Sequence, residues 1–197
     1  MLRIVGGTWG GRRIQTPPGR HTRPTPERVR EALFSRLAHL DAVAGAHVLD
    51  LYAGSGALGI EALSRGAAHV TFVESHGRTA GLVRRNLSGL DAPAAQWAVT
   101  VAKAEPFLRT ARPAVPWSLV LMDPPYAGEE YARVLPLLAT LPVVATGALI
   151  AVEAAAGAAL PLPAGLEQSR VDRYGDTQVI LLSKQALSAP APGAEQP

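Results

Sequence analysis

The chain has 197 residues, no cysteine and a formal net charge of +3 at pH 7. Its length allows one domain with a substantial core, and the lack of cysteine excludes a disulfide framework and a thiolate metal site. The first residues lack the apolar segment of a signal peptide, and Pro136, Pro142 and Gly147 interrupt the uncharged stretch 134–152, which argues against a membrane span. We therefore expect a cytoplasmic protein without membrane contact.

The positive charge is concentrated at the start of the chain. Residues 1–36 contain eight arginines and two glutamates, a local charge of +6, which leaves −3 for the remainder. A basic arm on a near-neutral body favours a polyanionic partner, with a solvated arginine-rich surface as the simpler alternative. Within the arm, segments 2–5 and 12–15 predict two short strands around a glycine-rich turn. Trp9 lies in that turn, where it either stacks on a base or covers the domain.

A helix is predicted to follow the arm, with Thr25 as N-cap, Pro26 in the first position and Glu27 in the first turn. Its buried face consists of apolar residues at helical spacing, namely Val29, Leu33, Leu37 and Leu40. Its arginines fall mostly on other faces. The arginines that we expect to contact nucleic-acid phosphates are Arg12, Arg13, Arg23, Arg28 and Arg30.

Residues 48–61 predict a buried strand, a glycine turn and a helix. Glycines in the turn permit positive φ and close approach of a ligand, and a helix N-terminus suits an anionic or polar group. The spacing G-x-G-x-x-G also matches the dinucleotide fingerprint. However, Asp50 would repel a pyrophosphate and attract the amino group of S-adenosylmethionine. The stretch resembles the first motif of class I S-adenosylmethionine-dependent methyltransferases, and the cofactor residues expected in it are Asp50, Tyr52, Gly54, Ser55 and Gly56.

Two further acids are candidates for cofactor contacts. Glu74 ends the second predicted strand, residues 69–74, about 20 residues beyond the turn, where a ribose-binding carboxylate belongs. Methyltransferases of this class usually place an acid or amide after the third strand, here residues 97–101, to hold adenine. Lys103 and Ala104 occupy those positions instead. Glu105, or backbone groups near Ala102 and Lys103, are therefore the candidates for the adenine contact.

The fourth predicted strand, residues 117–122, ends in Asp123-Pro124-Pro125-Tyr126. Two prolines restrict the backbone and remove two N–H donors. The Asp123 carboxylate and the Pro124 carbonyl then remain as acceptors for the amino group of a planar base, with Tyr126 as a stacking surface. The carboxyl ends of strands one and four share the ligand crevice of a doubly wound sheet. We therefore expect Asp123, Pro124 and Tyr126 to be catalytic.

The last part of the chain predicts a helix over 129–141, a fifth strand over 148–153 and a closing hairpin formed by 166–174 and 178–183. From residue 184 onward, Ala, Pro, Gly and Ser predict a disordered tail. The five histidines have no metal-like spacing, and no metal is expected.

Four segments occur in order: 23–34, 50–61, 123–126 and Arg173-Tyr174-Gly175-Asp176-Thr177. Together they resemble the RsmD family, which methylates the N2 amino group of a guanine in 16S ribosomal RNA. The resemblance implies an α/β, Rossmann-like, doubly wound sheet of seven mostly parallel strands with a closing antiparallel hairpin. It also implies a small basic extension at 1–24, a methyltransferase domain at 25–183 and a tail at 184–197.

The implied partner is 16S ribosomal RNA within a small-subunit particle, bound by a monomer. Several alternatives stay open at this point. A DNA or other RNA amino methyltransferase, acting on adenine N6 or cytosine N4, would use the same tetrapeptide. A protein-glutamine methyltransferase would share its logic. A non-enzymatic RNA-binding module would explain the arginines but not the acids at three strand ends, and Asp50 argues against a nicotinamide oxidoreductase.

Overall fold

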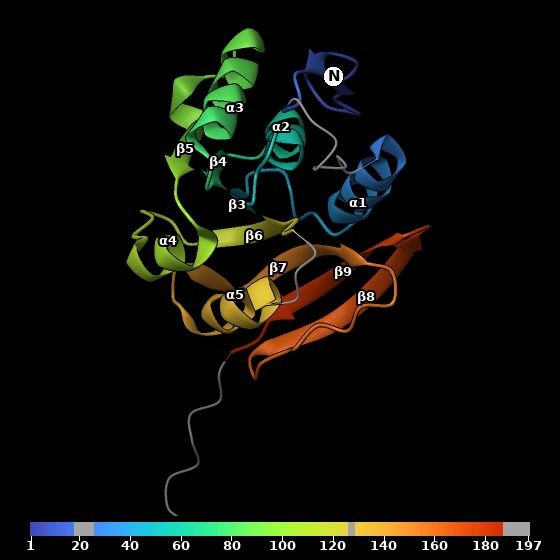
Figure 1. The fold of residues 1–197 in the computed structure, drawn as a ribbon, viewed down its shortest axis with the longest axis vertical. Coiled ribbons are helices and arrows are strands. Elements are labelled where there is room, and N and C mark those ends of the chain that lie inside the picture. The colour runs from blue at the N-terminus through green and yellow to red at the C-terminus, as the bar shows by residue number, and fades with distance from the viewer. Residues whose placement is uncertain (18–25, 126–128, 187–197) are drawn as a thin grey trace, which may run out of the picture.

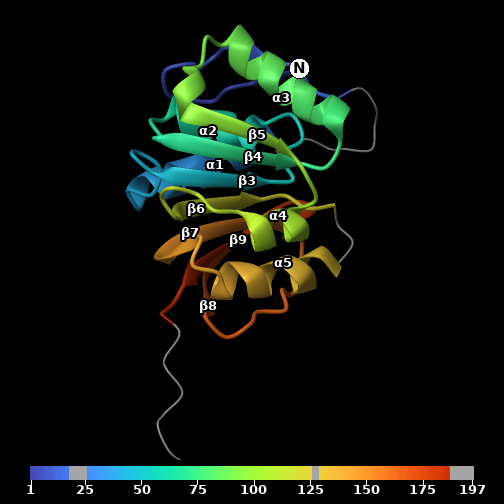
Figure 2. The ribbon, with the colours of Figure 1, turned by 90° about the vertical axis from the view of Figure 1, so that its left-hand side faces the viewer.

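The computed structural model describes residues 1–17, 26–125 and 129–186. Its centre is a seven-stranded sheet in the order β5-β4-β3-β6-β7-β9-β8, which can be followed from top to bottom in Figure 2. The strands are β3 (His47–Leu51), β4 (His69–Glu74), β5 (Trp97–Val101), β6 (Trp117–Met122), β7 (Val144–Ala155), β8 (Leu166–Tyr174) and β9 (Thr177–Lys184).

The pairing confirms the expected mostly parallel sheet with a closing hairpin. Strands β3 to β7 pair in parallel, whereas β9 is antiparallel to both β7 and β8. The buried strands β3 and β6 are nearly continuous apolar runs, as a strand covered on both faces requires. The order reverses between β3 and β6, so the ligand crevice of such a sheet lies at their carboxyl ends.

Helices cover both faces of the sheet (Figure 1). Side chains of the first three helices share one hydrophobic cluster, and side chains of the last two share a second. The helices are α1 (Glu27–His39), α2 (Ala57–Ser64), α3 (Gly77–Gly89), α4 (Ala104–Thr110) and α5 (Glu129–Thr140), with the 3-10 turn η1 (Ala94–Gln96) before β5. No helix within the described ranges is long and apolar enough to cross a bilayer.

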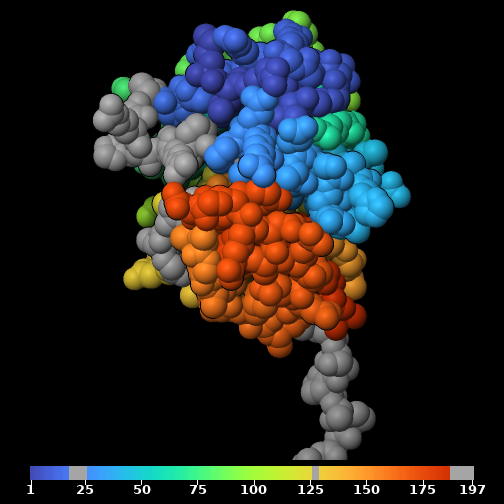
Figure 3. All heavy atoms as spheres, turned by 90° about the vertical axis from the view of Figure 1, so that its right-hand side faces the viewer, coloured from blue at the N-terminus to red at the C-terminus, as the bar shows by residue number. Residues whose placement is uncertain are grey.

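The N-terminal segment forms the predicted hairpin and packs onto the domain. Strands β1 (Leu2–Arg3) and β2 (Arg13–Ile14) pair antiparallel, and the segment lies beside α1 on the surface shown in Figure 3. Ile4, Trp9 and Ile14 join the same hydrophobic cluster as α1, α2 and α3. Trp9 is 9% exposed, so it covers the domain and does not offer a face for stacking.

Several predicted boundaries differ from the structure, among them the fifth strand, predicted at 148–153 and observed as Val144–Ala155, and the two ends of the methyltransferase domain. Helix α1 begins at Glu27 with Pro26 at its N-cap position, one residue later than expected, and Thr25 lies outside the described residues. At the other end, Lys184 is the last residue of β9 and is buried. Its ammonium group donates to the carbonyls of Leu141 and Val144 at 2.7 and 2.9 Å. The domain therefore extends beyond residue 183, and the rest of the predicted tail, 187–197, is not described.

Candidate active site

The carboxyl ends of three neighbouring strands bring the predicted site residues to one edge of the sheet. Strand β3 lies between β4 and β6, and its last residue, Leu51, is opposite Val73 and Met122. Glu74, predicted to bind the cofactor, comes directly after Val73, and Asp123, predicted to bind the substrate, comes directly after Met122. The edge therefore carries Tyr52, Glu74 and Asp123 next to the glycine turn.

The glycine turn has an unusual backbone. Tyr52, Gly54 and Gly56 have φ angles of 61°, 55° and 80°, all in the left-handed region. A Cβ on Gly56 would lie 3.0 Å from Cγ1 of Val83, so the missing side chain permits close packing of the turn on α3. A Cβ on Gly54 would have one described atom within 4 Å, the Tyr52 carbonyl oxygen at 3.8 Å. Gly54 is thus a point where a ligand can approach the turn backbone.

Three buried side chains fix this backbone. The hydrogen bonds run from the Gly59 N–H to Oδ2 of Asp50 (2.9 Å), from the Gly54 N–H to Oε2 of Glu74 (3.0 Å) and from Nδ2 of Asn86 to the Ser55 carbonyl (2.9 Å). The protein's own groups therefore fix the shape of the turn. Sequence reasoning missed Asn86. Its signal is a polar residue three positions after Val83, on the buried stripe of α3.

Asp50 does not have the environment that we predicted from its charge. It is 1% exposed, and its pKa is raised to about 7 as the net effect of burial, which raises it, the Gly59 N–H, which lowers it, and the Glu74 charge, which raises it. In this place the carboxyl holds the start of α2 through the Gly59 N–H. Because the Asp50 side chain is bound to the Gly59 N–H, a direct charge attraction between Asp50 and the cofactor stays a prediction.

Glu74 is bound on both carboxylate oxygens. Oε2 accepts the bond from Gly54 described above. The other oxygen, Oε1, accepts the backbone N–H of His76 at 2.9 Å and lies 3.2 Å from Nδ1 of the His76 ring. The Ser75 hydroxyl lies 3.4 Å from Oε1. Glu74 is 8% exposed, and these contacts position the carboxylate at the strand end beside the turn; its role in binding ribose stays a prediction.

Tyr52 and Asp123 lie side by side at the ends of β3 and β6. The Tyr52 hydroxyl donates to Oε2 of Glu130 at 2.6 Å, which ties the turn to α5, and burial raises the pKa of the phenol. Asp123 is half-buried and Pro124 is buried, whereas Pro125 is exposed. The Asp-Pro-Pro segment therefore opens from the core to the surface within three residues. Tyr126, predicted as the stacking surface, lies outside the described residues.

The comparisons with known proteins agree with this arrangement. Residues 2–183 match the family model described as Conserved hypothetical protein 95. The Ribosomal RNA small subunit methyltransferase D of Escherichia coli (strain K12) is 37% identical to this chain over 187 residues, which cover 94% of the chain and 91% of the relative. The chain belongs to this family, the RsmD family.

Two further likenesses cover most of the chain. The protein of the same name from Haemophilus influenzae (strain ATCC 51907 / DSM 11121 / KW20 / Rd) is 34% identical over 152 residues, 77% of this chain and 78% of the relative. The solved structure of yhhF from Escherichia coli superposes with a TM-score of 0.81 and 35% identity, over 94% of this chain and 99% of that chain. The fold and its closing hairpin are therefore those of the RsmD family.

Glu105, the acid proposed for adenine, lies in the first turn of α4. Its Oε1 accepts hydrogen bonds from Nε and Nη2 of Arg109 at 3.2 and 3.0 Å, one helical turn away. Its side chain is 36% exposed. The structure thus pairs Glu105 with a neighbour on its own helix, and its contact with adenine stays a prediction.

The predicted RNA-binding arginines have three different environments. Arg13 and Arg28 are exposed. Arg12 donates to the carbonyls of Gly89 and Leu90 at 2.7 and 3.2 Å, which ties the hairpin to the end of α3. Arg30 is 1% exposed and donates to the Arg3 carbonyl at 2.6 Å, so its predicted contact with RNA does not fit the structure. Arg23 lies outside the described residues.

The closing turn of the RsmD-like motif lies at the same edge of the sheet as Asp123. Ala155, near the carboxyl end of β7, is opposite Thr177 at the start of β9. Tyr174 lines a shallow groove of about 400 Å³ between α1 and β8, two elements that lie side by side in Figure 3. Arg36 lines the α1 side of this groove and Arg170 the β8 side.

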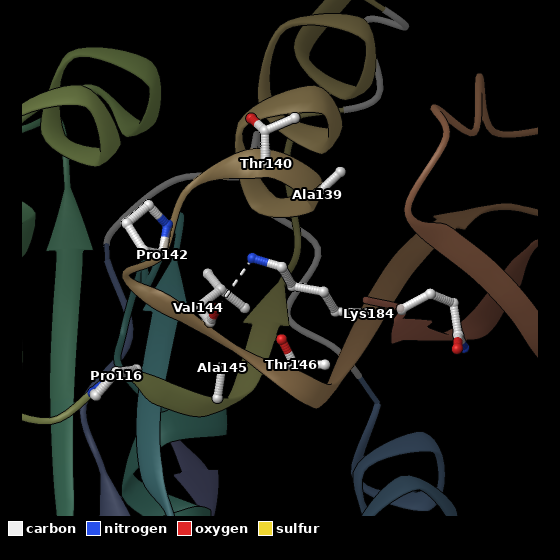
Figure 4. Close-up of a pocket in the computed structure, with 9 residues that line it drawn as sticks. Pro116, Ala139, Thr140, Pro142, Val144, Ala145, Thr146 and Lys184 are labelled. Atoms are coloured by element: carbon white, nitrogen blue, oxygen red, sulfur yellow. Dashed lines mark hydrogen bonds between the residues drawn. The ribbon is translucent and has the colours of Figure 1, made fainter. Parts of the chain in front are cut away.

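A second hollow in the described chain lies away from these residues. It measures about 440 Å³ and is lined by the start of β7, the end of α5 and Lys184 (Figure 4). Strands β6 and β7 begin here, so the hollow opens at the amino ends of the parallel strands. Ligands of doubly wound sheets bind at the carboxyl ends. The Lys184 ammonium group is held there by its hydrogen bonds to the carbonyls of Leu141 and Val144. We assign this hollow no part in the active site.

Proposed function

We propose that this protein transfers the methyl group of S-adenosylmethionine to the N2 amino group of a guanine in 16S ribosomal RNA. The observation that carries the proposal is the position of Asp123-Pro124-Pro125 at the end of β6, beside the glycine turn at the end of β3. The relatives are named Ribosomal RNA small subunit methyltransferase D, which supports RNA of the small subunit as the substrate.

The turn and its neighbours fit S-adenosylmethionine. Gly54 presents backbone without a side chain. Glu74 is fixed beside it, and a carboxylate oxygen that accepts one N–H bond retains a lone pair for a ribose hydroxyl. We assign Tyr52, Ser55 and Gly56 to the wall of this site and Asp50 to its support. Glu105 is the remaining side-chain candidate near the adenine end.

The substrate site follows from the chemistry of an exocyclic amino group. Its nitrogen is a weak nucleophile because the lone pair is delocalised into the base ring. Hydrogen bonds from its two N–H groups to the Asp123 carboxylate and the Pro124 carbonyl would favour a pyramidal nitrogen and aim the lone pair outward. S-adenosylmethionine, when bound, supplies an electrophilic methyl group. Positioning of the two reactants accounts for much of the rate, and we assign Asp123 the role of accepting the proton that the nitrogen gives up.

The target base has to leave its stack to reach Asp123, and Tyr126 is the proposed replacement surface. Exposed arginines of the hairpin and α1, such as Arg13 and Arg28, are proposed to bind phosphates around it. We further propose that the enzyme works as a monomer in the cytoplasm, on RNA within a small-subunit particle.

The test is methyl transfer from labelled S-adenosylmethionine to three acceptors: naked 16S RNA, small-subunit particles that lack the modification, and double-stranded DNA. The proposal expects label in RNA and, after digestion, N2-methylguanosine by mass spectrometry. Label in adenine N6 or cytosine N4 of DNA would support the DNA amino methyltransferase that uses the same tetrapeptide, and would overturn the assigned substrate.

A further inference from the structure

Asn86 joins two parts of the molecule that are far apart in sequence. It lies in α3 and is 5% exposed. Its Nδ2 donates to the Ser55 carbonyl at 2.9 Å and to the Gln15 carbonyl at 3.0 Å, and its Oδ1 accepts the Gln15 N–H at 2.9 Å. All three polar interactions of the amide group are therefore made with backbone, one to the cofactor turn and two to the N-terminal hairpin.

The orientation of this amide is fixed by its partners. Two carbonyl oxygens face Nδ2 and one N–H faces Oδ1. A flipped amide would place oxygen against two carbonyl oxygens and N–H against N–H. An amide has two N–H donors on one side and an acceptor on the other, which is the set that this position needs. No other side chain of similar size supplies it.

The bond to Ser55 acts at a sensitive point of the turn. Ser55 stands between Gly54 and Gly56, whose backbones are both left-handed. The N–H of Gly54 is held by Glu74 and the N–H of Gly56 by the Ala53 carbonyl at 2.7 Å. Asn86 holds the carbonyl between them. Loss of this bond would leave a buried acceptor unpaired in the segment that we propose to bind S-adenosylmethionine.

The hairpin is also attached to α2, the helix that follows the glycine turn. Oε2 and Oε1 of Glu61 accept the N–H groups of Val5 and Gly6 at 2.8 and 2.9 Å. The Ser64 hydroxyl accepts the Trp9 N–H at 2.9 Å and donates to the Gly6 carbonyl. Both side chains belong to α2, the helix that begins directly after Gly56. The turn and the hairpin thus share α2 and Asn86 as common supports.

We infer that Asn86 is a positioning residue that holds the glycine turn in its cofactor-binding shape and makes that shape depend on the seated N-terminal hairpin. The inference rests on the proposed function in one respect, the identity of the turn's ligand. It gives the arginine-bearing hairpin a second task besides contact with RNA. A ligand that binds only the seated hairpin will therefore raise the affinity for the cofactor. By linkage, the cofactor will raise the affinity for that ligand by the same factor.

The experiment measures S-adenosylhomocysteine affinity by calorimetry and thermal stability by scanning calorimetry on the full chain. Asn86→Asp keeps the size and the Oδ1 acceptor but removes both donors, and we expect its dissociation constant to rise about tenfold or more. Ser64→Ala loosens the hairpin without a contact to the turn, and we expect a smaller rise of about threefold. Val134→Ala, in the other hydrophobic cluster, is the control for general destabilisation and should change the affinity less than twofold.

The outcomes separate the possibilities. If Asn86→Asp lowers the melting temperature as much as Val134→Ala and leaves affinity unchanged, Asn86 is a structural residue and the inference is wrong. If Asn86→Asp weakens binding and Ser64→Ala does not, the dependence on the hairpin is refuted. Asn86→Ala, which removes the amide without adding charge, replaces Asn86→Asp if that variant does not fold. Absence of S-adenosylhomocysteine binding by the unmodified chain would instead refute the proposed cofactor.

Discussion

The carboxyl of Asp50 accepts the N–H of Gly59 at 2.9 Å, across the turn that joins β3 to α2. Asp50 comes before the turn and Gly59 belongs to the first half of the helix after it. The bond therefore links the end of the strand directly to the first turn of the helix. It also explains why the third glycine of the G-x-G-x-x-G spacing is a glycine, because a Cβ on Gly59 would lie 2.9 Å from Oδ2 of Asp50 and 2.3 Å from Cε1 of Phe72.

The first prediction is that Gly59→Ala is destabilising. The new methyl group would overlap the Phe72 ring and strain the bond to Asp50, at a cost of about 1–3 kcal/mol in the free energy of unfolding. Gly81→Ala is the matched control, since Gly81 also lies inside a helix but its Cβ would be 3.5 Å from the nearest atom, at the flexible end of Arg85. There the higher helix propensity of alanine should stabilise the protein by up to about 1 kcal/mol. Urea unfolding of both variants checks the pair, and equal effects would contradict this account.

The second prediction concerns the pH dependence of stability. The pKa of Asp50 is raised to about 7 in the folded protein from an ordinary value of 3.8. The folded state therefore holds a proton that the unfolded chain has already released. The stability linked to this proton is complete below about pH 4, declines as pH rises and is lost above about pH 7.

Asp50→Asn keeps an oxygen to accept the Gly59 N–H but cannot ionise. Its stability relative to the unmodified protein should rise between pH 5 and pH 7 by about 1 kcal/mol or more, and should level off above pH 7. Chemical unfolding at a series of pH values measures this difference. A difference that stays constant from pH 5 to pH 8 would show that Asp50 does not titrate in this range.

The third prediction separates substrate chemistry from cofactor binding. Asp123→Asn keeps the shape of the side chain but removes its charge and one acceptor. The side chain can then neither hold the amino group of the base as before nor accept its proton. We expect kcat to fall about 100-fold or more, while the dissociation constant of S-adenosylhomocysteine changes less than about twofold. A fall in cofactor affinity with an unchanged kcat would place Asp123 in the cofactor site instead.

The sheet and the turn could be predicted because apolar strands and glycines leave a local pattern. The runs at 48–51 and 117–122 became β3 and β6, and their neighbouring ends placed Asp123 beside the turn as expected. The RsmD resemblance fixed the closing hairpin.

The sequence did not reveal the direction of single polar side chains. Asp50 turns toward Gly59 and becomes buried, which no strand pattern reveals. Arg30 lies on the same helical stripe as Phe34 and Leu37, so its burial was visible in the spacing but was outweighed by its charge. Asn86 was overlooked because its partners, Gln15 and Ser55, are 71 and 31 residues away. Such contacts depend on the tertiary arrangement of segments.

The last prediction concerns which arginines bind RNA. Arg13 and Arg28 are exposed on the hairpin and on α1, whereas Arg30 is buried against the Arg3 carbonyl. Each phosphate contact that is lost lowers the log–log salt dependence of binding by roughly one unit. Replacing Arg13 and Arg28 together by alanine should therefore lower that slope by about two units and weaken RNA binding.

Two controls define the result. Arg109→Ala with Arg133→Ala removes the same charge from α4 and α5, in the opposite helical layer, and should leave the slope almost unchanged because these side chains pair with Glu105 and Glu129 on their own helices. Arg30→Ala should lower thermal stability without changing the slope, since its guanidinium serves the hairpin and not the solvent. Fluorescence anisotropy with a labelled 16S fragment at several salt concentrations measures all three. If the Arg13/Arg28 double variant and the Arg109/Arg133 double variant lose the same slope, RNA binding is a property of total charge, and the assignment of a phosphate-binding face to the hairpin and α1 is wrong.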